Sequence, residues 1–179
     1  MTNNDIAAFF RAQMLAMLAD QGHPEIDVTA SFQPDNQGRL VGPVLYFVEL
    51  GDDPCGGQGF QTSTNVSTGE TTTTSTQRMR VTYQVQGFAP VNKEDLSVMR
   101  AGDIVKLALM LLKSPVFIAA LKENGMGIER IPTTKPNFVV NDQAQYEAGP
   151  LFEFTLSYRR TIIQKSAIVT TADFAIHRV

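Results

Sequence analysis

Residues 61–86 read QTSTNVSTGETTTTSTQRMRVTYQVQ, and this stretch decides the fold. Eleven of its first sixteen residues are Thr or Ser, and threonine has a high β propensity. The turn residues near 67–70 predict two extended strands joined there. The outer part of this hairpin carries almost no apolar residue, so the core of its own domain cannot bury it. Such a hairpin either projects towards a partner or is a disordered loop in the free subunit, and the two interpretations are compatible.

The second half of the stretch alternates between apolar and polar residues. Every second position from Met79 to Val85 is apolar, and the positions between are Arg80, Thr82 and Gln84. Successive side chains of a strand point to opposite faces, so this alternation predicts a half-buried strand.

Two other segments also read as strands. Residues 44–50 (VLYFVEL) predict a buried strand that ends at 51–54, before a glycine-containing stretch expected to stay flexible. Residues 151–163 give the clearest strand in the chain, in which Arg159 and Arg160 point to opposite faces and so form no joint anion clamp. Shorter strands are expected near 126–131 and 138–140.

Three segments predict helices. Residues 3–20 begin with asparagines suited to the N-cap and continue with apolar residues at helical spacing. A second helix is expected from about 94 to 113, with Gly102 marking a place of close packing, because glycine inside a helix costs about 1 kcal/mol relative to alanine. Residues 114–125 predict a short third helix, which begins at a Ser-Pro pair and ends at an Asn-Gly pair.

This order of elements predicts an α+β fold, with a mostly antiparallel sheet, helices on one face and a long projecting β-hairpin. We expect a single domain over residues 1–163, with the Thr-rich hairpin at about 58–80. Residues 164–179 are expected to form a C-terminal tail.

Composition excludes several classes of protein. The chain has 179 residues, of which 43% are apolar and 18% charged, and its net charge is -3. It contains no apolar run of about 18 residues, so no membrane span is expected, and no block of like charges that would suit nucleic acid. The charge is uneven: residues 1–60 carry -6 and residues 61–179 carry +3. Such asymmetry either steers assembly between unlike faces of identical subunits or is an ordinary solvated surface.

The residues needed for catalysis are missing. Cys55 lies close to Asp52 and Asp53, and these three residues could belong to a metal-binding loop. A structural zinc site needs about four ligands, so a plain turn is the better interpretation of this segment. Neither a phosphate-binding glycine loop nor a nucleophile elbow occurs. We therefore expect no enzyme, no cofactor and no metal.

Contact with other subunits is the expected role of the polar hairpin and the tail. Arg78 and Arg80 share a face at the base of the hairpin, where they either bridge to an acidic neighbour or are solvated. The tail has too many apolar residues for pure disorder. The candidate contact residues are Thr62, Thr64, Thr68, Thr71, Thr72, Thr73, Thr74, Arg78, Arg80, Arg159, Ile168 and Phe174.

A series of short motifs resembles the neck or tail terminator proteins of long-tailed phages, especially contractile-tailed ones. The resemblance covers about residues 43–163, roughly two thirds of the chain, as an order of elements with a few recurrent residues. The motifs are VTYQVQG at 81–87, the helix restart at Ser114-Pro115, GMGI at 125–128, PNFVVND at 136–142 and FEFTLSY at 152–158.

The resemblance implies a structural virion protein that forms a hexameric ring, caps the tail tube and possibly the sheath, and joins it to the head-completion proteins of the neck. It implies a place in the tail or neck of the virion, assembly in the host bacterial cytoplasm, and passage of genomic DNA through the lumen without specific binding. Two alternatives stay open: a head-completion, connector or minor tail protein of the same virion, and a small ligand-binding or regulatory domain.

Overall fold

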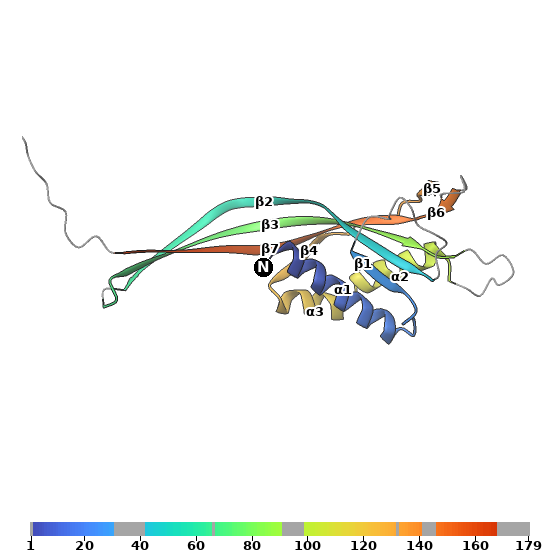
Figure 1. The fold of residues 1–179 in the computed structure, drawn as a ribbon, viewed down its shortest axis with the longest axis horizontal. Helices are drawn as coiled ribbons and strands as arrows, with labels where there is room; N and C mark the ends of the chain where they lie inside the picture. Colours follow the sequence, from blue (N-terminus) through green and yellow to red (C-terminus); the bar gives the residue numbers. More distant parts are fainter. Residues whose placement is uncertain are drawn as a thin grey trace, which may run out of the picture.

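A five-stranded sheet with three helices on one face makes up the body of the protein (Figure 1). The computed structural model describes residues 2–30, 42–65, 67–90, 99–131, 133–140 and 146–167. The sheet order is β1-β2-β3-β7-β4, and β5 and β6 form a separate two-stranded sheet. The elements are α1 (Asn3–Asp20), β1 (Asp27–Ala30), β2 (Val44–Asn65), β3 (Glu70–Phe88), α2 (Ala101–Leu112), α3 (Pro115–Glu123), β4 (Met126–Arg130), β5 (Phe138–Val140), β6 (Tyr146–Ala148) and β7 (Leu151–Ala167).

The expected α+β class is confirmed. Among the described strands, only β1 and β2 pair in parallel, and the other pairs are antiparallel. The hairpin is the pair β2–β3, and its turn lies where the sequence predicts it, with Gly69 at φ 64°. This left-handed conformation favours glycine.

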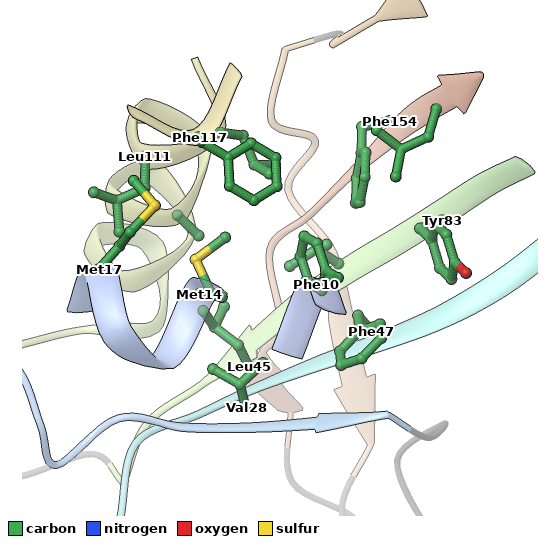
Figure 2. Close-up of a cluster of buried hydrophobic side chains, with 14 of the residues drawn as sticks. Phe10, Met14, Met17, Val28, Leu45, Phe47, Tyr83, Leu111, Phe117 and Phe154 are labelled. Carbon is green, nitrogen blue, oxygen red and sulfur yellow. The ribbon is translucent and has the colours of Figure 1, made fainter. Parts of the chain in front are cut away.

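The core lies between the sheet and the helices, and Phe10 of α1 is at its centre (Figure 2). Its ring centroid is 4.7 Å from that of Phe47 and 5.2 Å from that of Phe154. The alternation expected for β3 is confirmed, because Met79, Val81, Tyr83 and Val85 are buried on the face that the helices cover. Every second residue of β3 from Met79 to Val85 therefore packs into the core of the body.

Strand β2 is longer than its sequence predicts. It continues through 51–54, where its end was expected, and through the glycine-containing stretch expected to be flexible, as far as Asn65. The strand accommodates these residues through two irregularities in its register with β3, between Glu49 and Gly51 and between Cys55 and Gly59. The expected end of the strand at 51–54 was wrong because pairing with β3 outweighs the weak strand propensity of glycine.

The helices differ from expectation at their starts. Thr2, and not an asparagine, is the N-cap of α1, and it forms a capping box with Asp5. Helix α2 begins at Ala101, after the non-helical Arg100, and the expected start near residue 94 lies outside the described residues. The expected α3 is confirmed, with Ser114 as its N-cap.

No single described helix is long and apolar enough to cross a membrane. Helices α2 and α3 reach that length and composition only as a pair, bent by 56° at the break between them.

Two glycines provide a matched test of packing. A Cβ on Gly87 would lie 2.5 Å from Cγ2 of Val105 and 3.1 Å from the carbonyl oxygen of Ala101, whereas a Cβ on Gly102 would meet nothing within 4 Å. The close packing expected at Gly102 is therefore wrong, and β3 makes the close approach to α2 at Gly87.

We expect Gly87→Ala to lower the free energy of unfolding by about 1–3 kcal/mol through overpacking. Gly102→Ala should raise it by about 0.4–1 kcal/mol, because alanine has less freedom to lose on folding and suits a helix better. Urea denaturation of both variants measures the difference. Equal effects of the two substitutions would contradict the close contact between β3 and α2.

Candidate assembly surface: the three-stranded arm

Three strands extend beyond the body as a narrow arm (Figure 1). Strand β4 pairs with β7 only as far as Tyr158. Tyr158 of β7, Met79 of β3 and Pro54 of β2 lie in one row across the sheet. We call the residues beyond this row the arm, which comprises residues 55–78 and 159–167. The sheet of the body contains five strands, of which at most four lie side by side at any one level, and the sheet of the arm contains three.

The third strand of the arm is the main feature that sequence reasoning missed. Strand β7 pairs with β3 without a register shift from Gln86↔Leu151 to Glu70↔Ala167. Residues 164–167, which were assigned to the tail, are therefore part of this strand. The signal was the uninterrupted absence of glycine and proline from 151 to 167, but its partner is about 90 residues away along the chain.

The threonines form ladders across the arm. The hydroxyl oxygens of Thr62 and Thr73 are 3.5 Å apart, and those of Thr64 and Thr71 are 3.4 Å apart. Thr72 and Thr74 alternate with these residues and so lie on the opposite face, and Thr68 is in the turn, with its hydroxyl 3.5 Å from the carbonyl oxygen of Asn65. These candidate contact residues therefore cover both faces and the tip of the arm.

Large apolar side chains are exposed among the polar ones. Phe60 is 69% exposed, Ile162 is 54% exposed and Ile163 is 64% exposed. Phe60 and Ile162 lie in one row, on either side of Ser75. Apolar groups gathered on a narrow polar surface are typical of a protein contact site.

Arg78 and Arg80 bind an acidic neighbour within the same chain. Nη2 of Arg78 lies 2.8 Å from Oε1 of Glu129, and Nε of Arg80 lies 2.5 Å from Oε2. Arg78 also donates to the hydroxyl of Ser157 over 3.2 Å. This ion-pair cluster links β3 to β4 across β7 at the base of the arm, so both arginines have a structural role there while staying about half exposed.

The other arginine pair, Arg159 and Arg160, lies at the start of the part of β7 that extends beyond its pairing with β4. Arg159 lies opposite Arg78 and Arg160 opposite Gln77, so the two point to opposite faces as expected. Both are exposed, and neither forms an ion pair with another described residue. Ile168 and Phe174, the candidate contact residues of the tail, lie outside the described residues.

A polar cluster joins α1 to the base of the arm. The Tyr158 hydroxyl is 3.0 Å from Oδ1 of Asn3 and 3.0 Å from Oδ2 of Asp52. Burial, together with the hydrogen bond to Asp52, raises the pKa of Tyr158 to about 12. The Tyr83 hydroxyl and Oδ1 of Asp52 are buried without a hydrogen-bond partner among the described residues, and burial raises the pKa of Tyr83 as well.

The expected turn at Cys55 is wrong, because Cys55 lies in β2 opposite Arg78. Within the described ranges, no group of three His, Cys, Asp or Glu side chains is placed to hold a metal ion.

The sequence matches the family described as "E217 gateway protein gp29" over residues 5–168. The chain belongs to this family. The resemblance to phage neck and tail terminator proteins is thereby confirmed at the level of the family, and the chain is a structural phage protein. The segment that matches the gateway protein family includes nearly all of the body and the whole arm.

This gateway family member is also similar to the solved structure described as "Cryo-EM Structure of an Extracellular Contractile Injection System, PVC sheath/tube terminator in extended state". The two are 13% identical, with a TM-score of 0.43, and the match covers 96% of this chain. This chain spans 63% of the length of that one. No curated protein matches the sequence.

The Tyr158 cluster gives a test of how the arm is anchored to the body. We expect Tyr158→Phe to lower the free energy of unfolding by about 1 kcal/mol, because Asn3 and Asp52 lose a hydrogen-bond partner. Tyr83→Phe removes a hydroxyl that has no partner among the described residues, so it should be neutral or slightly stabilising. Urea denaturation at pH 7 compares the two variants, and a larger loss for Tyr83→Phe would contradict the assignment.

The raised pKa of Tyr158 predicts a loss of stability at high pH. Between pH 10 and about 12 the folded state keeps a proton that the unfolded state has released. The free energy of unfolding should therefore fall as the pH rises above 10, and it should fall less steeply in Tyr158→Phe. Urea denaturation of both proteins at pH 8 and pH 11 measures this difference, and identical slopes would contradict it.

Proposed function

We propose that this protein is a ring-forming tail terminator, which caps the phage tail tube and sheath and joins them to the head-completion proteins of the neck. The single observation that carries the proposal is the three-stranded arm, which presents exposed apolar side chains and strand edges that no other described part of the chain covers. A subunit of a closed ring needs such unlike, projecting surfaces. Membership of a phage gateway family supports the proposal.

The partners follow from this role. The protein binds copies of itself in a ring, which we take to be a hexamer, and places one face of the ring on the tail tube and the other towards the neck. Genomic DNA passes through the lumen without specific binding. The protein is assembled in the host cytoplasm and resides in the virion. Ile168 and Phe174 stay predictions as contacts with a neighbouring subunit.

The arm can be shortened with little effect on the body. Thr62 lies opposite Thr73, so replacing residues 63–72 with Asn-Gly, a pair favoured in tight hairpin turns, closes the hairpin earlier. The removed residues are exposed or half-buried, apart from the undescribed residue 66, and the core residues are all retained. We expect this variant to fold, to form few rings and to leave tail tubes uncapped.

Negative-stain microscopy and sedimentation velocity, with and without purified tail tubes, measure assembly. Lys122→Ala, at an exposed position of α3, is the control and should form rings as the unmodified protein does. Normal rings from the shortened variant would contradict the role of the arm. An unmodified protein that stays monomeric and never binds tube ends would contradict the proposed function.

A further inference from the structure

The outer edges of β2 and β7 are free in the described structure along the arm, and the free edge of β2 also continues into the body. Strand β1 covers the outer edge of β2 only along Val44–Phe47, which leaves residues 48–65 without a neighbour on that side among the described residues. Strand β4 covers the outer edge of β7 only as far as Tyr158, which leaves residues 159–167. A free edge offers unpaired backbone N–H and C=O groups to another chain.

The two free edges carry opposite charge. The free part of β2 contains three acidic residues and no Lys or Arg, whereas the free part of β7 contains three basic residues and no Asp or Glu. The acidic residues are Glu49, Asp52 and Asp53, and the basic residues are Arg159, Arg160 and Lys165. Three of the eight acidic residues in 1–60 and three of the thirteen basic residues in 61–179 thus lie on two opposite edges of one sheet.

Some of these side chains already have a partner within the subunit, an acidic one for Lys165 and neutral donors for Asp52 and Glu49. Lys165 lies 3.5 Å from Glu70, Asp52 accepts from Tyr158 and Glu49 accepts from Asn3. Asp53 and Arg159 are exposed and have no ion-pair partner among the described residues. These two side chains are therefore available to a second copy.

Charge excludes one kind of pairing and favours the other. Two β7 edges placed together would oppose basic residues, and two β2 edges would oppose acidic ones, so both symmetric pairings are disfavoured. Pairing of a β2 edge with a β7 edge brings opposite charges together. A contact between unlike surfaces of identical chains is heterologous, and it closes into a ring when the rotation between subunits allows.

We propose that the acidic edge of β2 and the basic edge of β7 are the two halves of a head-to-tail contact between copies of this chain, with Asp53 of one copy facing Arg159 of the next. The contact rests on the ring formation proposed above, and it names the surfaces that form the ring.

The register of the sheet sets the level at which the two edges meet. Asp53 and Ser157 both lie level with Arg80, and Arg159 is two residues closer to the tip than Ser157. Strand β4 occupies the edge of β7 up to Tyr158, so Arg159 is the first basic residue that a neighbouring edge reaches. Side-chain alternation puts Arg159 on the same face of the sheet as Ser157 and hence as Asp53.

The same placement brings apolar groups together. Phe60 and Ile162 are level with each other on opposite edges of the arm, on either side of Ser75. When Asp53 of a neighbouring copy faces Arg159, the β2 edge of that copy is shifted by two residues towards the tip. Phe60 of the neighbouring copy then lies diagonal to Ile162, a distance that an aromatic side chain can span. The contact therefore covers two of the exposed apolar side chains of the arm.

Charge reversal tests the contact. We expect Asp53→Arg and Arg159→Asp each to weaken ring formation at least tenfold in midpoint concentration, because each places like charges opposite one another. The double variant D53R/R159D should restore rings, since the opposite charges face each other again. An equimolar mixture of the two single variants should also restore them. In a ring in which the two variants alternate, every contact pairs one acidic side chain with one basic side chain.

Sedimentation velocity and negative-stain microscopy give the readout, and unchanged circular dichroism spectra and unfolding midpoints show that each variant folds. Lys113→Asp, an equal change of charge at an exposed position beyond the end of α2, should form rings normally.

The outcomes separate this contact from the proposed function. If the unmodified protein forms rings and both single variants do so equally well, or neither the double variant nor the mixture recovers them, this contact is wrong and ring formation stands. If the unmodified protein forms no ring, alone or on tail tubes, both proposals fail.

Discussion

Strand β3 forms backbone hydrogen bonds with β2 on one side and β7 on the other, and the rest of the structure depends on this double pairing. The pairing runs from Glu70 at the tip to Gln86 in the body. In the body the alternating side chains of β3 enter the core beneath α1. In the arm the same strand continues with Thr and Ser, where no helix covers it (Figure 1). One strand thus belongs to two environments, and its sequence changes where the helices end.

The arm is therefore a sheet without a core of its own. A two-stranded hairpin in water is marginally stable, and a third strand supplies a second row of hydrogen bonds to β3. β-branched threonines suit the extended backbone, and their hydroxyls lie opposite one another across the strands. The low charge content of the sequence agrees with this construction, because uncharged polar residues avoid repulsion between closely spaced strands.

Much of the fold could be predicted from local patterns. The alternation from Met79 to Val85, the Ser114 cap of α3 and the turn at Gly69 are set by neighbouring residues, and all three are confirmed. The extension of β7 along β3 could not be predicted in this way. Its partner is distant in sequence, and residues 164–167 carry only a weak strand pattern of their own.

The same distinction applies to the candidate contact surface. The threonines were found because their composition is unusual, and the shared face of Arg78 and Arg80 followed from alternation. Their bond to Glu129 depends on β4 lying beside β7, which no local pattern reveals. The continuation of β2 through a glycine-rich stretch was missed for the same reason, since β3 imposes the extended backbone there.

The length and regularity of the arm have a mechanical consequence. In antiparallel strands the hydrogen bonds run perpendicular to the chain direction, so a pull along the arm loads the whole β3–β7 ladder in shear. A shear load is shared by many bonds at once, whereas a sideways peel breaks them one after another. The arm is therefore built to carry tension along its axis, and the ion pairs of Arg78 and Arg80 with Glu129 fasten it at the end where that tension enters the body.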